Sequence, residues 1–142
     1  HHANLLNSIL AKIQANAAGA DDAIMLDSRG FIAETNATHL FMVQGGLLRT
    51  PTVAACPEGI TRATVLGLCR THAIAHEIGD LSLAELYRAD EAFCTGTMGE
   101  LAGVTEVDGR RIGDGTIGPM TRRLSALYAE CTAAGGTRMV EP

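Results

Sequence analysis

The hydrophobic residues of this chain change their spacing several times, and this change constrains the fold most. From Asn4 to Ala17 the apolar residues recur every three or four positions, which is the period of a helix with one apolar face. Ala23–Leu26 and Phe31–Ala33 are instead short apolar runs, and Asp27-Ser28-Arg29-Gly30 between them is typical of a turn. The sequence has no internal repeat, so it predicts a mixed α/β domain rather than a solenoid.

The same alternation continues to the end of the chain. Gly45-Gly46 and Asp108-Gly109 are expected to turn two further hairpins, while Thr61 and Ser82 are expected to serve the first turns of two helices. The expected strands are 40–43, 47–49, 76–78, 92–95, 104–107 and 110–112, and the expected later helices are 60–71, 83–87 and 119–133. We expect one domain over residues 1–134 and a frayed tail over 135–142.

Composition limits the kinds of partner. The chain has 142 residues, 46% of them apolar, which suits a single core. Its net charge is -5, and Lys12 is its only lysine, so we expect no basic face for nucleic acid. No apolar run reaches the length of a membrane span, and the first ten residues lack the pattern of a secretion signal. A soluble, cytoplasmic protein is expected.

Cysteine and histidine spacing predicts no metal site. The four cysteines form no CxxC pair, and no histidine stands at zinc-ligand spacing from them. We interpret them as buried free thiols in a reducing compartment. His39, His72 and His76 share no metal-binding pattern, so structural or surface roles are expected for them.

Two segments offer backbone amides to an anion. In Glu58–Arg62 a glycine precedes a helix, where the helix dipole favours negative charge and Thr61 adds a hydroxyl. Thr95–Gly99 is a turn of small and hydroxyl residues at the end of a strand. Either alone is more often a plain helix start or turn, but together they suggest a phosphate cradle.

Glu34 is a carboxylate set between apolar segments. Such a residue more often points outward, and when it is buried it needs a cationic partner. A protonated pyridine nitrogen would supply that charge. The carboxylate would in turn keep the nitrogen protonated, which is what allows a pyridine ring to act as an electron sink.

The order of these motifs resembles the C-terminal half of class IV, or fold type IV, enzymes that use pyridoxal 5'-phosphate (PLP). The resemblance extends from Asn4 to about Leu127. The segments that carry it are 4–8, 34–41, 59–62, 89–93, 95–100, 107–109, 113–115 and 118–119. It implies the large cofactor-binding domain of that fold, a twisted, mostly antiparallel, barrel-like sheet flanked by helices, and it implies a homodimer.

The resemblance also implies roles for residues of this chain. The cofactor-binding residues that it implies are Glu34, Asn36, Ile60, Thr61, Gly96 and Thr97. Glu34 is implied to pair with the pyridine nitrogen, and Asn36 to order the loop behind the ring. The backbone amides of Ile60 and Thr61 and the Thr61 side chain are implied to hold the phosphate, and Thr97 to complete the cradle.

The family's Schiff-base lysine lies three or four residues before the asparagine that matches Asn4. We therefore expect it at His1 or just upstream, together with an N-terminal domain, and no catalytic residue within this chain. Lys12 lies too far along the first helix to replace it. Met98 and Gly99 are implied to lie beside the substrate carboxylate.

The resemblance implies reversible transfer of an amino group between an amino acid and a 2-oxo acid. Branched-chain substrates come first, because Thr95–Glu100 resembles branched-chain aminotransferases more than other members. Leu5 stands where many of those enzymes carry Tyr, while D-amino-acid transaminases can have Leu, so D-amino-acid transamination and aminodeoxychorismate lyase activity stay open. A non-catalytic PLP-binding, phosphate-binding or dimerisation domain is the alternative from another class, and it predicts no upstream lysine.

Overall fold

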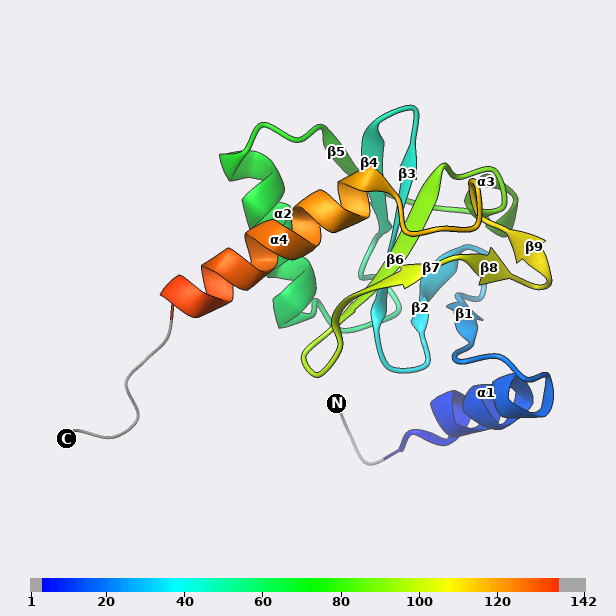
Figure 1. Cartoon of the computed structure of the whole chain (residues 1–142). Helices are drawn as coiled ribbons and strands as arrows, with labels where there is room; N and C mark the ends of the chain where they lie inside the picture. The colour runs from blue at the N-terminus through cyan, green and yellow to red at the C-terminus, as the bar shows by residue number, and fades with distance from the viewer. Residues whose placement is uncertain (1–3, 136–142) are drawn as a thin grey trace.

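The structure is a computed structural model that describes residues 4–135. Runs of strands separated by helices follow one another along the described chain (Figure 1). In chain order the elements are α1 (Leu6–Ala17), β1 (Ile24–Leu26), β2 (Ile32–Thr35), β3 (His39–Gln44), β4 (Leu47–Pro51), α2 (Ile60–Thr71), β5 (His76–Gly79), α3 (Leu83–Leu86), β6 (Glu91–Gly96), β7 (Glu100–Val104), β8 (Glu106–Val107), β9 (Arg110–Arg111) and α4 (Pro119–Ala134).

Five strands form the main sheet, in the order β5-β4-β3-β6-β7. Neighbouring strands are antiparallel except β4 and β5, which are parallel because α2 connects them. Strands β1 and β2 form a separate antiparallel pair, and so do β8 and β9. The expected mixed α/β class with a mostly antiparallel sheet and flanking helices is confirmed.

The central strand β3 is buried on both faces. Its side chains alternate, so Phe41 and Val43 pack toward α2 and α4 while Leu40 and Met42 pack on the opposite face. The Phe41 and Phe93 rings stack with their centroids 5.0 Å apart. Figure 1 shows α2 and α4 together on one side of the sheet, and the two helices contact each other. The hydrophobic clusters on the two faces of the sheet hold β3 in place, and with it the residues at the ends of this strand.

Several local predictions are confirmed. Gly45 and Gly46 have φ of 58° and 80° and turn the β3–β4 hairpin, as a two-residue loop with positive φ requires. Helix α2 has the predicted bounds. Ser82 opens α3 with a capping box, in which its side chain and that of Glu85 bind each other's backbone N–H groups.

Strand β7 is not predicted by the sequence, and the prediction that Val104 belongs to the third hairpin is wrong. Residues 100–104 pair with β6, and the third hairpin begins at Glu106. Gly103 weakens the strand pattern here, and it lies so close to Ile117 that a β-carbon would be 2.7 Å from the Ile117 Cγ1. Tertiary packing therefore decides this strand. The predicted tail lies largely outside the described residues, and the boundary at 134 stays a prediction.

Helix α1 is helical as predicted, but its apolar face is not buried by the described chain. Leu6, Ile9 and Ile13 are each more than half exposed, and only Ala15 of this helix is buried. Gly19 follows with φ of 72°, as expected of a glycine after a helix end. Figure 1 places α1 beyond β1, on the side of the molecule away from α2 and α4.

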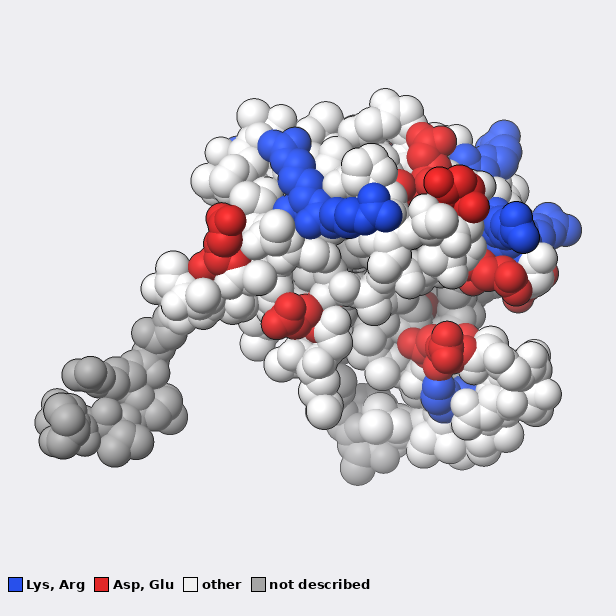
Figure 2. All heavy atoms as spheres, viewed as in Figure 1, with Lys and Arg blue, Asp and Glu red and all other residues white. Residues whose placement is uncertain are grey.

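The surface of the described chain carries mixed charge. On the face drawn in Figure 2, basic and acidic side chains form small separate groups. None of the helices within residues 4–135 is long and apolar enough to cross a membrane. All four cysteines are free, as predicted, but only Cys69 is buried, whereas Cys131 on α4 is exposed.

Candidate functional site

A tight turn of residues 35–38, here called the 35–38 turn, joins β2 to β3. The Thr35 N–H donates to the Thr38 carbonyl at 2.8 Å, and the Thr38 N–H donates to the Thr35 hydroxyl at 3.0 Å. The two hydroxyl oxygens lie 2.7 Å apart. This short connection fixes Glu34 at the end of β2 and His39 at the start of β3 as neighbours.

Glu34 is half-buried, and its carboxylate has no hydrogen-bond partner within residues 4–135. Burial raises the pKa of this carboxyl, and the charge of His39 opposes that rise. A carboxylate that is partly desolvated and unpaired is stabilised by any cation that reaches it. The predicted buried acid is therefore found at a half-buried position, with the unmet need for positive charge that the sequence suggests.

Asn36 ties the 35–38 turn to the start of β1. Its backbone N–H donates to the Ala23 carbonyl at 3.0 Å. Its side-chain amide faces the Asp22 carboxylate, and the amide nitrogen belongs on that side, because only a donor can face a carboxylate favourably. Asn36 therefore orders the turn behind Glu34, and its proposed role toward a cofactor ring stays a prediction.

The N-terminus of α2 is open. Its N-cap residue is Gly59, with φ of 71°, and no side chain of residues 4–135 caps the first turn. The prediction that Thr61 serves this turn is wrong: the Thr61 side chain is buried and makes no capping hydrogen bond, since Gly59 replaces the usual capping residue. Ile60 is 85% exposed. The first N–H groups of a helix need partners from outside it, so this end can accept an anion.

His39 connects the 35–38 turn to the start of α2. A ring nitrogen, Nε2, lies 2.7 Å from the Pro57 carbonyl oxygen. The His39 ring also lies against Gly59, so closely that a β-carbon at Gly59 would overlap it. Gly59 is thus required twice, for its positive φ and for the space that the ring takes.

The end of β6 lies on the other side of the 35–38 turn. His39 pairs with Thr95, and a β-carbon at Gly96 would be 2.9 Å from the Thr38 Cγ2. The Thr95 hydroxyl is buried and has no hydrogen-bond partner in the described part of the chain, which costs about 1–3 kcal/mol. Thr97 is exposed in the loop beyond, between β6 and β7.

The structure thus brings together most of the predicted cofactor residues. Glu34 precedes the 35–38 turn and Asn36 lies within it, while the end of β6 contacts Thr38 and the start of α2 contacts His39 directly after the turn. In the β6–β7 loop Met98 is fully exposed and Gly99 is exposed, and nothing lies within 4 Å of a β-carbon added at Gly99. Their expected place beside a substrate stays a prediction.

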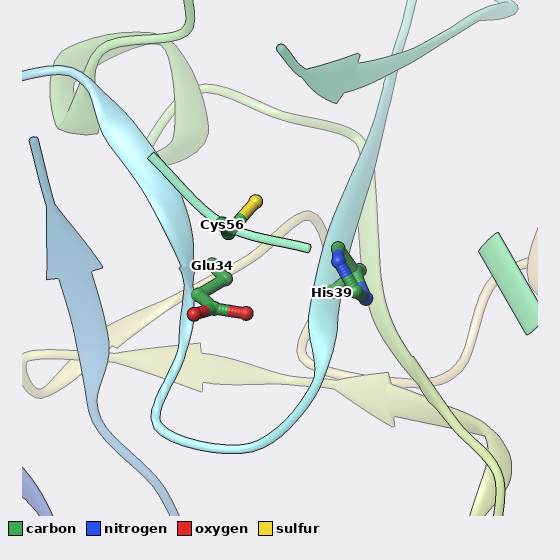
Figure 3. A group of neighbouring side chains, drawn as sticks. All are labelled: Glu34, His39 and Cys56. Carbon is green, nitrogen blue, oxygen red and sulfur yellow. The ribbon is translucent and has the colours of Figure 1, made fainter. Parts of the chain in front are cut away.

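Three residues outside the predicted cofactor set join the candidate site, and one of them, Thr95, lies in the 95–99 segment that the sequence predicts to bind an anion. Thr95 has a local signal, because it shares the buried face of β6 with Phe93 and a polar residue there is unusual. His39 and Cys56 have none, because their contact depends on the fold. Figure 3 shows Glu34, His39 and Cys56 around the space between β2 and β3, and one ligand atom from each lies within 4.8 Å of the other two.

The family model for "Amino-transferase class IV" matches residues 1–107. The chain belongs to the class IV aminotransferases. The matched region contains Glu34, the start of α2 and the β6–β7 loop, whereas α4 lies beyond it. The part of the chain that carries the candidate site is therefore the part that defines the family.

Individual class IV aminotransferases resemble the chain over most of its length. It is 52% identical over 136 residues to the branched-chain-amino-acid aminotransferase-like protein 2 of Arabidopsis thaliana, covering 96% of this chain and 24% of that protein. It is 41% identical to the branched-chain-amino-acid aminotransferase of Pseudomonas aeruginosa, covering 90% of this chain and 45% of that one. The chain spans less than half the length of these relatives.

The solved class IV structures share the fold. A branched-chain amino acid aminotransferase solved with pyridoxamine 5'-phosphate superposes with a TM-score of 0.89 and 39% identity, over 92% of this chain and 44% of that one. The Escherichia coli branched-chain amino acid aminotransferase gives a TM-score of 0.85 and 36% identity, over 89% and 43%. The fold expected from the sequence, that of fold type IV enzymes, is confirmed.

Proposed function

We propose that this chain is the cofactor-binding part of a PLP-dependent aminotransferase. The observation that carries the proposal is the placement of two opposite electrostatic needs on either side of the 35–38 turn. The unpaired carboxylate of Glu34 suits a protonated pyridine nitrogen, and the open N-terminus of α2 suits a phosphate. PLP carries both groups on one ring.

The residues present fit this cofactor. The Thr95 hydroxyl lacks a partner within residues 4–135, and Gly59 and Gly96 leave room for close approach at the two sides of the turn. The amides of Ile60 and Thr61 would hold the phosphate together with Gly96 and Thr97, while Glu34 would keep the ring nitrogen protonated. The bound cofactor would supply an electron sink for bonds to the substrate α-carbon.

The proposed reaction is amino transfer between an amino acid and a 2-oxo acid, with branched-chain amino acids as the first substrates to test. The branched-chain names of the relatives support this choice of substrate, and the pyridoxamine phosphate in a solved branched-chain enzyme supports amino transfer. The lysine that holds and deprotonates the substrate complex would precede Asn4, at His1 or before it. Met98 and Gly99 would lie beside the substrate carboxylate. We further propose a cytoplasmic homodimer, as the resemblance implies.

Thr61→Val tests the phosphate half of the site, with Thr64→Val as the matched control in the same helix turn. The Thr64 hydroxyl is already bonded to the Ile60 carbonyl at 3.0 Å, whereas the Thr61 hydroxyl has no such bond. In the complete protein, PLP titration should give an affinity about 5–10-fold weaker for Thr61→Val, the loss of about one hydrogen bond, and an unchanged affinity for Thr64→Val. Equal affinities in both variants would contradict the proposed cradle.

An amino-donor screen with 2-oxoglutarate tests the reaction itself. L-Leucine, L-isoleucine and L-valine should support amino transfer, and Glu34→Gln should abolish most of it while PLP still binds. Activity with D-alanine alone would favour the D-amino-acid alternative. PLP binding without any amino transfer would favour a non-catalytic domain, and no PLP binding would overturn the proposal.

A further inference from the structure

Glu34, His39 and Cys56 form a cluster of three metal-type donors that the spacing of the sequence does not reveal. They come from β2, from β3 and from the loop before α2, and they offer one oxygen, one nitrogen and one sulfur. All three side chains are half-buried, and their ligand atoms lie within 4.8 Å of one another (Figure 3). Within residues 4–135 this is the only group of its kind.

We propose that the protein, when free of cofactor, binds a borderline divalent metal ion of the zinc type through Glu34, His39 and Cys56. Mixed oxygen, nitrogen and sulfur donors suit Zn²⁺ and Co²⁺, whereas Mg²⁺ and Ca²⁺ prefer oxygen alone. Three protein ligands leave a fourth position for water. The proposed site is therefore an open one rather than a closed structural site.

The separations of the donors suit a tetrahedral ion after small adjustments. Ligands at zinc distances of about 2.0–2.3 Å lie roughly 3.5 Å from each other around the metal. Since the donors lie within 4.8 Å of one another, they need to approach by at most about 1.3 Å, which rotations of the Glu34 and Cys56 side chains can provide. The His39 ring is the fixed member, because Pro57 and Gly59 hold it in place.

The charges of the cluster also favour a cation. The Glu34 carboxylate has no partner within residues 4–135. The Cys56 thiol points its proton toward the Ala33 carbonyl, with the sulfur 3.6 Å from that oxygen. On binding, the thiol proton would pass to solvent, because a thiol ligates a metal as its thiolate, and the dication would compensate the thiolate and the Glu34 carboxylate.

The metal would share Glu34 with the proposed cofactor. If Glu34 pairs with the ring nitrogen of PLP, a metal on Glu34 and PLP exclude each other, and zinc would keep PLP out of the apo protein. This competition rests on the proposed function, whereas metal binding itself does not. The two claims can therefore be tested separately.

The test uses the complete protein freed of PLP, with Zn²⁺ added in competition with a chromophoric zinc indicator. The expected result is one Zn²⁺ per chain, with affinity reduced at least about 100-fold in Cys56→Ser and in His39→Asn. Cys131→Ser and His72→Asn are the matched controls, since both residues are exposed and lie outside the cluster. Their affinities should equal that of the parent. Circular dichroism checks that each variant is folded.

Cobalt gives a second measurement that does not depend on affinity. Co²⁺ added to the apo protein should produce sulfur-to-metal charge-transfer absorbance, which Cys131→Ser keeps and Cys56→Ser loses. Equal zinc binding in the Cys56 and Cys131 variants, or no charge-transfer band in the parent, overturns the metal site. If zinc binds but saturating PLP does not displace it, the metal site stands and the role proposed for Glu34 toward PLP fails. If PLP binds and zinc does not, the metal site fails and the proposed function is unaffected.

Discussion

Helices α4 and α2 both begin directly after a glycine, yet their N-termini are satisfied in opposite ways. The buried carboxylate of Glu91 reaches α4 from β6, and it accepts the N–H groups of Met120 and Thr121 at 2.9 and 2.8 Å. It also accepts the Thr121 hydroxyl at 2.8 Å, and a β-carbon at Gly118 would overlap it. Helix α2 receives no such group after Gly59 from the described part of the chain.

The difference shows where the protein stabilises itself and where it leaves capacity for a ligand. Both helix ends have the same need for negative charge. At α4 a residue of the chain meets this need, so that end is part of the core. At α2 the need is unmet, and His39 and the 35–38 turn lie beside it. An open helix end next to an unpaired acid thus distinguishes the proposed binding site at α2 from the structural cap at α4.

Glu91→Gln should have the largest effect of the variants that test this comparison between α4 and α2. It replaces a carboxylate that accepts three hydrogen bonds by an amide that can accept fewer, so the free energy of unfolding should fall by about 2–4 kcal/mol. Asp90→Asn is the control, because Asp90 accepts only the exposed Gly45 N–H at 2.7 Å and should cost at most about 1 kcal/mol. Urea unfolding of the complete protein measures both.

The same variant should leave the proposed phosphate binding at α2 intact. PLP affinity of Glu91→Gln, measured below its unfolding transition, should match that of the parent. If Glu91→Gln lowers the free energy of unfolding no more than Asp90→Asn does, Glu91 is not needed to begin α4. A large loss of PLP affinity would show that the two helix ends are coupled.

Gly59→Ala is the matching change at the open end. Alanine at φ of 71° costs about 1–2 kcal/mol, and here its β-carbon would also overlap the His39 ring. Gly46→Ala is the control, since Gly46 has φ of 80° and nothing lies within 4 Å of an added β-carbon. The expected loss is about 2–3 kcal/mol for Gly59→Ala and about 1–2 kcal/mol for Gly46→Ala. PLP affinity should fall in Gly59→Ala and not in Gly46→Ala. Equal PLP affinities in the two variants would mean that Gly59 is needed only for its positive φ.

Local chemistry explains which parts of this comparison the sequence can predict. Gly59 and the apolar spacing after it predict the helix start at Ile60, and Gly45-Gly46 predicts the β3–β4 turn. Ser82 predicts the start of α3. Each of these signals lies within a few residues of the feature that it predicts.

Contacts between distant segments account for what the sequence cannot predict. Glu91 precedes Thr121 by 30 residues, and nothing near either residue indicates that one caps the other's helix. His39 and Cys56 meet only because β4 runs back along β3 before the loop to α2 begins. The polar setting of Glu34 and the family resemblance predict it as a site residue. Its half-buried position is decided by packing.

Helix α3 gives the smallest and most local test, because it closes its own N-terminus within one turn. The Ser82 hydroxyl accepts the Glu85 N–H at 3.3 Å, and the Glu85 carboxylate accepts the Ser82 N–H at 2.9 Å. Ser82→Ala should therefore cost about 1 kcal/mol and leave PLP affinity unchanged. The hydrogen bond from Arg49, followed by those from Ser82, lowers the pKa of Glu85 from 4.5 to about 2.

A lowered folded-state pKa means that ionised Glu85 stabilises the fold above pH 4.5, and that this contribution is lost as pH falls from 4.5 toward 2. Glu85→Gln should therefore be less stable than the parent at pH 7, and the difference should shrink between pH 4.5 and pH 2. Urea midpoints measured across that range test it, with Glu77→Gln as the control. Glu77 also faces Arg49, at 3.4 Å, but its side chain is 53% exposed, so solvent should screen the pair. If the stability difference between Glu85→Gln and the parent stays constant with pH, the Glu85 cap acts through its geometry rather than its charge. In that case α3 would differ from α4, where the charge of Glu91 is expected to stabilise the helix start.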